Sequence, residues 1–407
     1  MNQSIGREYP PELRRFRDPK TGRHIEQLTS GKSNSYPLYY FIPSITADGR
    51  YLVFHGERTA WVQLYRLDLQ TGQIVQLTDA RTMDSGWAMW CQWRLRGVYV
   101  HLSALNRITE EVWYFQDQEV RATHLRTLTN RKVADLPSGR MPIGQNDFSP
   151  DGSGFVFIHA DRERYLQVMR QREALANMGH DIWGDHQSMR EQMGSVTLGY
   201  IDTATGQYRE IITRDFHFHH VVFAAPKTMV VNHPKGCNGM WSVDLDGGNV
   251  RHLRPGNAPG AGGAEVCHQV ITANGIFYEA NHWDADKRRA CVCVGRYDLA
   301  ADSFREVRLG DLGFVHTGWD PAGRFLFIES AAREHRLLSV HFPHDSRRLR
   351  YTCIRTLAPS RSEQRFHAHP FLTPDRNWMV FTDLADNGFG QIFRLNVSDL
   401  ANLPEYW

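Results

Sequence analysis

Short runs in which apolar and polar residues alternate fill most of the chain, separated by turns built on Asp or Asn with Gly. This pattern is typical of β-strands joined by tight turns. One unit, an apolar residue followed by such a turn and a strand, recurs along the sequence. Its clear copies are SITADGRYLVF (44–54), DFSPDGSGFVF (147–157), VITANGIFYEA (270–280), GWDPAGRFLFI (318–328) and PFLTPDRNWMVF (370–381), and its weaker copies are CQWRLRGVYVHL (91–102) and VVFAAPKTMVV (221–231).

A second unit follows these copies and consists of a strand, a polar turn and another strand. Examples are LYRLDLQTGQIVQLT (64–78) and LGYIDTATGQYREII (198–212). Four strands per repeat and a period of about 50 residues indicate a β-propeller rather than a solenoid or a sandwich. The copies therefore predict an all-β, seven-bladed β-propeller of four-stranded blades, formed as a single domain by residues 1–407. Six and eight blades remain alternatives.

The two ends of the chain are predicted to close the ring together. RHIEQLTSG (23–31) resembles the outermost strand GQIVQLTD (72–79) of the first repeat. The last repeat ends at QIFRLNV (391–397) without a strand of this kind. We therefore expect the N-terminal strand to complete the last blade, which removes two exposed strand edges.

One segment does not fit the repeat. Residues 161–194 are rich in Gln, Glu, Arg, Met and Leu, which favour helix. The segment predicts a helical insertion over one face of the propeller. It carries His180, Trp183 and His186, so it could serve as a lid, and a packing element or the contact of a homodimer is an equal alternative.

Composition narrows the classes of function. The formal net charge is +2, which gives no electrostatic footprint for nucleic acid or an anionic membrane surface. No apolar run approaches the roughly 20 residues of a membrane-spanning helix, and the N-terminus lacks the apolar core of a secretory signal. We therefore expect a cytoplasmic protein. Because the six cysteines form no CxxC motif, we expect them to be buried, reduced thiols.

The start of each innermost strand of a propeller faces the central channel, so residues at these positions should converge. The chain has 20 histidines, and several of them occupy such positions together with amides and aromatic residues. The converging set is Tyr39, Tyr40, Trp87, Trp90, Gln145, Asn146, His217, His219, His220, His268, His316, Gln364, His367 and His369.

The most specific local element is QRFHAHP (364–370). His367 and His369 are two residues apart, so on a strand both side chains face the same side. Gln364 and, from the preceding repeat, His316 complete a set of three imidazoles and one amide. Such a low-charge set suits a divalent ion such as Mn²⁺, and its ligand types also admit Zn²⁺.

These residues resemble the oligogalacturonate lyases, pectin-degrading β-propeller enzymes. The family motif Q-x-x-H-x-H-P with a following F-T-P corresponds here to QRFHAHPFLTPDRNWMVFTDLADNG (364–388). The resemblance implies Mn²⁺ bound by His316, Gln364, His367 and His369. It also implies that His268, in EVCHQVITANG, is the general base of a β-elimination that cleaves oligogalacturonides.

One departure concerns the substrate. The family has an Arg immediately before M-W, where CNGMWSVDL places Gly239. Arg is suited to bidentate recognition of a uronate carboxylate. Lys235, Arg288 and Arg365 are substitutes for it, and His219, His220 and His233 are expected as further substrate contacts. A lyase for a different uronide and a non-catalytic binding propeller remain the alternatives.

Overall fold

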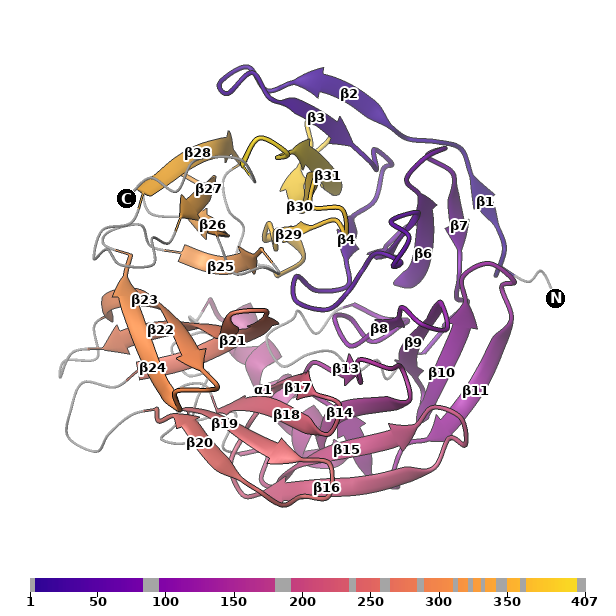
Figure 1. Cartoon of the computed structure of the whole chain (residues 1–407). Helices are drawn as coiled ribbons and strands as arrows, with labels where there is room; N and C mark the ends of the chain where they lie inside the picture. Colours follow the sequence, from indigo (N-terminus) through magenta and orange to yellow (C-terminus); the bar gives the residue numbers. More distant parts are fainter. Residues whose placement is uncertain are drawn as a thin grey trace.

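Seven antiparallel sheets surround a common centre, so the predicted seven-bladed β-propeller is confirmed (Figure 1). The structure is a computed structural model. It describes residues 4–82, 95–179, 192–233, 239–256, 264–283, 289–309, 314–320, 325–330, 334–341, 350–358 and 364–400.

The blades are numbered in chain order, and each is given from its innermost strand outward. Blade 1 contains β4 (Ser35–Pro37), β5 (Tyr51–Gly56), β6 (Gln63–Asp68) and β7 (Ile74–Gln76). Blade 2 contains β8 (Ala104–Asn106), β9 (Glu111–Gln116), β10 (Glu119–His124) and β11 (Asn130–Asp135). Blade 3 contains β12 (Arg140–Pro142), β14 (Gly154–Asp161), β15 (Val196–Asp202) and β16 (Tyr208–Arg214), with β13 (Asp147–Phe148) also paired to β14.

Blade 4 contains β17 (His220–Ala225), β18 (Thr228–His233), β19 (Gly239–Asp244) and β20 (Arg251–Arg254). Blade 5 contains β21 (Ala264–Thr272), β22 (Gly275–Trp283), β23 (Arg289–Asp298) and β24 (Ser303–Arg308). Blade 6 contains β25 (Phe314–Trp319), β26 (Phe325–Ser330), β27 (Arg336–His341) and β28 (Arg350–Thr356). Blade 7 contains β29 (Phe371–Leu372), β30 (Trp378–Leu384), β31 (Gly390–Asn396) and β3 (His24–Gln27), and the 3₁₀ turn η1 (Gln364–Phe366) precedes it.

The closure predicted from the sequence is present. β3 pairs with β31, with Ile25 opposite Leu395. The N-terminal segment also adds strands that the repeat did not predict. β2 (Arg14–Arg17) lies outside β3, and β1 (Glu8–Tyr9) pairs with β7. The first residues therefore border both blade 7 and blade 1 and cover the outer edges where the ring closes.

A recurrent D-x-x-T-G sequence builds the outer hairpins. Asp18, Asp68 and Asp202 each accept the backbone N–H groups of the residues two and three positions ahead. The Gly that ends each of these turns has a positive φ, between 70° and 79°. The Asp side chain thus replaces backbone partners within the turn, and Gly adopts the left-handed conformation without a Cβ penalty.

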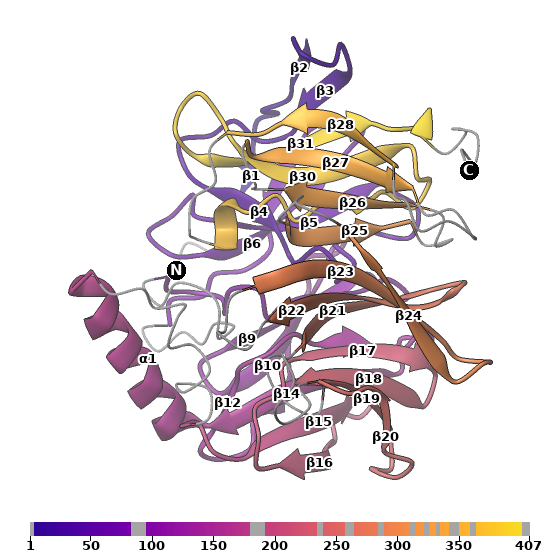
Figure 2. The same ribbon diagram turned by 90° about the vertical axis from the view of Figure 1, so that its left-hand side faces the viewer.

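The insertion between β14 and β15 begins with α1 (Arg162–Asn177), so its predicted helical character is confirmed for this part. Asp161 caps α1 by accepting the N–H of Arg164. The buried side chains of Tyr165, Val168 and Met169 pack on the propeller, and α1 lies at one side of the ring (Figure 2). His180, Trp183 and His186 lie outside the described residues. The structure's one described helix is too short and too polar to span a membrane.

Candidate metal centre and adjacent histidine

Histidines from six blades meet at the centre of the ring. Their rings form a continuous series in which neighbouring centroids are 4.1–5.8 Å apart. In order, the series is His55, His101, His369, His316, His268, His220, His219 and His217. The sequence prediction that histidines converge on the channel thus matches their positions.

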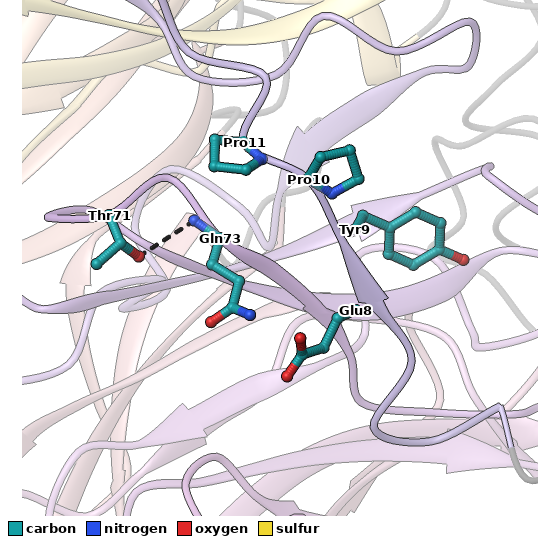
Figure 3. A pocket seen from close by; sticks show the side chains of 6 residues that line it. All are labelled: Glu8, Tyr9, Pro10, Pro11, Thr71 and Gln73. Carbon is teal, nitrogen blue, oxygen red and sulfur yellow. Dashed lines mark hydrogen bonds between the residues drawn. The ribbon is translucent and has the colours of Figure 1, made fainter.

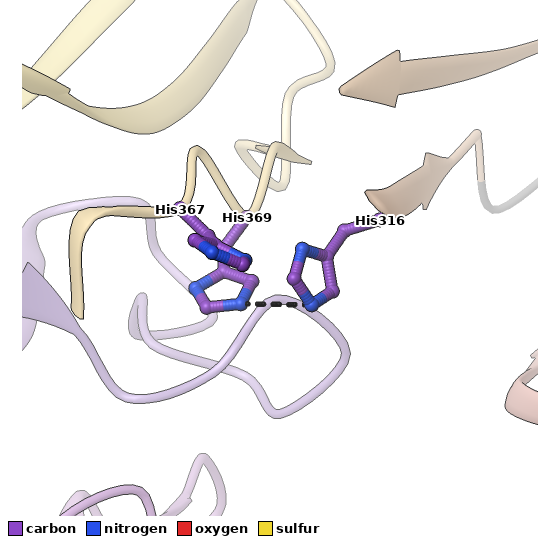
Figure 4. A group of neighbouring side chains, drawn as sticks. All are labelled: His316, His367 and His369. Atoms are coloured by element: carbon purple, nitrogen blue, oxygen red, sulfur yellow. Dashed lines mark hydrogen bonds between the residues drawn. The ribbon is translucent and has the colours of Figure 1, made fainter. Parts of the chain in front are cut away.

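Two histidines of this series and the neighbouring His367 can share one ion. His316 of β25 and His367 and His369, between η1 and β29, place one ring nitrogen each within 4.8 Å of the others (Figure 4). The Nε2 atoms of His369 and His316 are 3.3 Å apart. All three side chains are buried. The side chain of Gln364 lies outside the described part, so its role as a ligand stays a prediction.

The local backbone at this motif differs from the strand assumed in the sequence analysis. His367 and His369 lie in an irregular segment, and His369 has a φ of +43°. The expectation of a strand was therefore wrong. A residue other than Gly is strained in this conformation, and such strain concentrates at functional sites. The bend brings His369 toward His316 of the neighbouring blade.

Glu329 on β26 sets the protonation of His316. Its carboxylate accepts hydrogen bonds from His316 Nδ1 (3.1 Å) and His335 Nε2 (2.8 Å), and His335 Nδ1 donates to the carbonyl of Ala358. Burial alone would raise the pKa of Glu329, but these two histidines hold it well below its ordinary value. With Nδ1 of His316 donating, its Nε2 keeps the lone pair that a metal requires.

Burial favours the neutral form of His316 and His369. It lowers the pKa of His316 to about 3 and moves the pKa of His369 well below its usual value. Neutral imidazoles with correctly directed lone pairs are ligands for first-row divalent ions. The residues present therefore fit a bound Mn²⁺ or Zn²⁺, and His316, His367 and His369 are the ones that would hold it.

We expect Glu329→Gln to weaken metal binding by roughly 10–100-fold, because an uncharged amide no longer fixes the tautomer of His316. Titration of the metal-free protein with Mn²⁺ measures the change. Glu119→Gln, in a surface ion pair of blade 2, is the matched control and should bind the ion like the unaltered protein. Equal affinities for the two variants would contradict the assigned role of Glu329.

His268 lies beside this cluster and has the partners of a general base. Its Nδ1 donates to Oε2 of Glu279 at 2.6 Å, and Thr317 donates to Oε1 of the same carboxylate at 2.6 Å. Nε2 is thereby left as the proton acceptor. The ring centroids of His268 and His316 are 5.3 Å apart. The side chain of His268 is 15% exposed, whereas that of His316 is 2% exposed.

The backbone directs His268 inward. Its φ is +55°, and the pairing of β21 with β22 is interrupted between Cys267 and Val270. A bulge of this kind redirects a side chain next to an active site. His268 and His369 therefore both owe their position to strained backbone rather than to regular strand geometry.

Tyr40 of blade 1 contacts both the candidate metal ligands and His268. The ring of Tyr40, which follows β4, stacks on His369 with centroids 5.4 Å apart and also contacts His268 and His316. Its hydroxyl is buried and has no hydrogen-bond partner among the described residues. Tyr39 contacts His369 as well. Tyr39 and Tyr40 thus fill the centre of the ring, while Trp87 and Trp90 lie outside the described residues.

The other predicted substrate contacts have different surroundings. His220 lies next to His268, with ring centroids 5.0 Å apart, and His219 packs against His220. Arg365 forms an ion pair with Glu57 at 2.6 Å. Lys235 and Arg288 lie outside the described residues, as does the side chain of His233. The substrate role of each of these residues stays a prediction.

Gly239 is required by the backbone. Its φ is +50°, and a Cβ atom there would lie 2.1 Å from the carbonyl oxygen of Arg254 on β20. No side chain fits without displacement of that strand. The close packing of β19 against β20 therefore excludes an Arg at this position unless the backbone of β20 moves.

A separate groove lies at the outer edge of blade 1. It has a volume of about 360 Å³ and is lined by Glu8, Tyr9, Pro10, Pro11, Thr71 and Gln73 (Figure 3). Its residues belong to β1, to the two prolines that follow it and to the turn before β7. The groove is therefore separate from the candidate site residues at the centre of the ring.

The fold and the central histidines define a seven-bladed propeller with a candidate metal centre. The chain is similar to the structure of an oligogalacturonate lyase in complex with manganese, with 18% identity, a TM-score of 0.79 and coverage of 98% of this chain and 100% of the other. An oligogalacturonate lyase from Vibrio parahaemolyticus matches with 17% identity, a TM-score of 0.78 and coverage of 97% and 99%. No family model and no curated protein matches the sequence. The resemblance to oligogalacturonate lyases is thus confirmed in the fold.

Proposed function

We propose that this chain is a metal-dependent lyase that cleaves short oligogalacturonides by β-elimination. The observation that carries the proposal is the placement of the His268–Glu279 pair beside the imidazoles of His316, His367 and His369. A base next to a carboxylate-binding metal site is what elimination from a uronide requires. The shared fold and the manganese complex of the similar lyase support the same reaction.

Elimination from a uronide has two chemical requirements. The proton on C5 of a uronide is weakly acidic because the adjacent carboxylate keeps its negative charge. Mn²⁺ or another divalent ion on His316, Gln364, His367 and His369 would neutralise that carboxylate and stabilise the charge that develops at C5. Neutralising the carboxylate is the first requirement. The second is a neutral base within hydrogen-bond reach of the C5 proton.

His268 is the proposed neutral base. Its Nε2 accepts the C5 proton, the electrons of the C–H bond form the C4–C5 double bond, and the C4–O bond breaks with its electron pair on the leaving oxygen, which takes up a proton from solvent. Glu279 keeps Nδ1 protonated before this transfer and stabilises the imidazolium after it. Thr317 holds the second oxygen of Glu279, which fixes the carboxylate in the plane that His268 needs.

A different uronide is the second candidate substrate, and Gly239 favours it. Because Gly239 packs against the backbone of Arg254, recognition of a carboxylate distant from the metal must use other residues. A purely binding propeller is disfavoured, since it has no use for buried carboxylates that fix the tautomers of His268 and His316. Burying such charges costs free energy, so two buried carboxylates paired with histidines favour a chemical role for this site.

Product analysis in isotopically labelled water tests the reaction type. Elimination yields an unsaturated sugar that absorbs ultraviolet light and contains no oxygen from the solvent. Hydrolysis yields a saturated product that carries the label. We expect the unlabelled, absorbing product from an oligogalacturonide, and a labelled product would contradict the proposal. Activity on another uronide alone would assign the same reaction to the second candidate substrate.

A further inference from the structure

Blade 5 contains a second cluster of metal-binding side chains, away from the central histidines. His282 on β22, Cys293 on β23 and Glu306 on β24 place one donor atom each within 4.8 Å of the others. Cys291 lies two residues before Cys293 on the same strand, and the two Sγ atoms are 3.8 Å apart. Both thiols are free.

The cluster is on the opposite face of the sheet from the proposed base. Along β22, Glu279 faces His268, and His282, three residues further, faces the other side. Strand pairing places His282 opposite Cys291, and Cys293 and Glu306 share that face. Cys293 belongs to the apolar core between blades 4 and 5. The cluster therefore lies at the contact of two blades.

The carboxylate of Glu306 joins residues of blades 4 and 5. Oε1 accepts hydrogen bonds from Nε of Arg254 (2.8 Å), which belongs to blade 4, and from the hydroxyl of Tyr278 (3.1 Å). Oε2 lies 2.8 Å from Nε2 of His282 and accepts a longer hydrogen bond, 3.3 Å, from Nη2 of Arg254. Arg254 thus holds both oxygens of the carboxylate, and Glu306 lies close to His282 and Cys293.

We propose that His282, Cys291, Cys293 and Glu306 form a second metal site that takes Zn²⁺ and joins β22, β23 and β24. Zinc accepts thiolate, imidazole and carboxylate ligands, usually four of them in a tetrahedral arrangement. Two thiolates on one tetrahedral zinc lie about 3.8 Å apart, given Zn–S bonds of about 2.3 Å. The two sulfurs of blade 5 already have this separation.

The thiols give this site a different metal preference from that of the central histidines. Imidazole and amide ligands bind Mn²⁺ and other hard or borderline ions, whereas thiolates select softer ones. Zn²⁺ or another thiophilic ion therefore suits blade 5 better than Mn²⁺ does.

Cobalt substitution of the full-length chain tests the proposal. Co²⁺ bound to thiolates gives a ligand-to-metal charge-transfer absorbance that a site of histidines and an amide cannot give. We expect the chelator-treated protein to develop this absorbance on Co²⁺ addition and to lose it when Zn²⁺ is added. A His316→Ala/His369→Ala variant, which lacks the central site, should keep the absorbance. A folded, reduced wild-type protein without it would overturn the proposal.

Substitutions of the proposed ligands test whether the Co²⁺ absorbance arises in blade 5. Cys293→Ser should abolish the absorbance, and the matched control Cys353→Ser, in blade 6, should retain it. If Cys293→Ser does not fold, His282→Asn serves instead, because the side chain of His282 is 31% exposed and its loss leaves the core intact. It should weaken Zn²⁺ binding by roughly tenfold or more. Unchanged binding in His282→Asn, or a Cys291–Cys293 disulfide in the purified protein, would contradict the site.

Discussion

His268→Ala is expected to lower kcat for oligogalacturonide cleavage by roughly 10²–10⁴-fold, the usual contribution of a positioned general base. The reason is that the proposed reaction assigns the C5 proton to Nε2 of His268, whose ring lies beside that of His316. Steady-state rates of formation of the unsaturated product measure the effect. Metal affinity should stay unchanged, since His268 is not among the residues expected to hold the ion.

The Glu279→Gln variant distinguishes the orientation of the His268 ring from the proton transfer to it. The amide can still contact His268 but cannot stabilise its imidazolium, so kcat should fall less than in His268→Ala while KM stays similar. The control is Glu265→Gln, a neighbouring acidic residue on β21 outside the histidine series. A His268→Ala variant with nearly full activity and bound metal would remove His268 from the mechanism.

The second large effect is expected at Gly239. Gly239→Arg should destabilise the protein instead of restoring the arginine found in oligogalacturonate lyases. The positive φ costs about 1–3 kcal/mol for a residue other than Gly, and the Cβ would overlap the carbonyl of Arg254. β20 must move to relieve this overlap. Thermal unfolding monitored by circular dichroism measures the loss.

Gly22→Arg is the matched control for this substitution. Gly22 also has a positive φ, +70°, but a Cβ there meets no atom within 4 Å. It therefore carries the same backbone strain without the overlap, and its melting temperature should fall much less. If Gly239→Arg were as stable as Gly22→Arg and cleaved galacturonides faster than the unaltered chain, the position would be an ordinary substrate contact.

Much of the fold follows from local sequence. Strand alternation and the D-x-x-T-G turns act over a few residues, so the number of blades and the match between residues 23–31 and the last blade were predictable. The additional strands β1 and β2 were not predicted, because they belong to no repeat. Their pairing depends on edges that exist only once the ring has closed.

The positions of the site histidines were predictable, but their partners were missed. Glu279 lies in the middle of β22 and Glu329 near the end of β26, each directly after a short apolar run. A charged residue within the second strand of two successive blades was a usable signal, since buried carboxylates need partners. The strained backbone at His268 and His369 was not predictable, because no local pattern encodes a positive φ at histidine.

The central claim is that the histidines at the middle of the ring bind a metal on which cleavage depends. The most direct test measures ultraviolet absorbance of product from oligogalacturonides, with chelator-treated protein, before and after Mn²⁺ is added. The account predicts negligible activity without the ion, recovery on its addition, and no recovery in His369→Ala. Full activity of the metal-free protein, or equal recovery in His369→Ala, would contradict it.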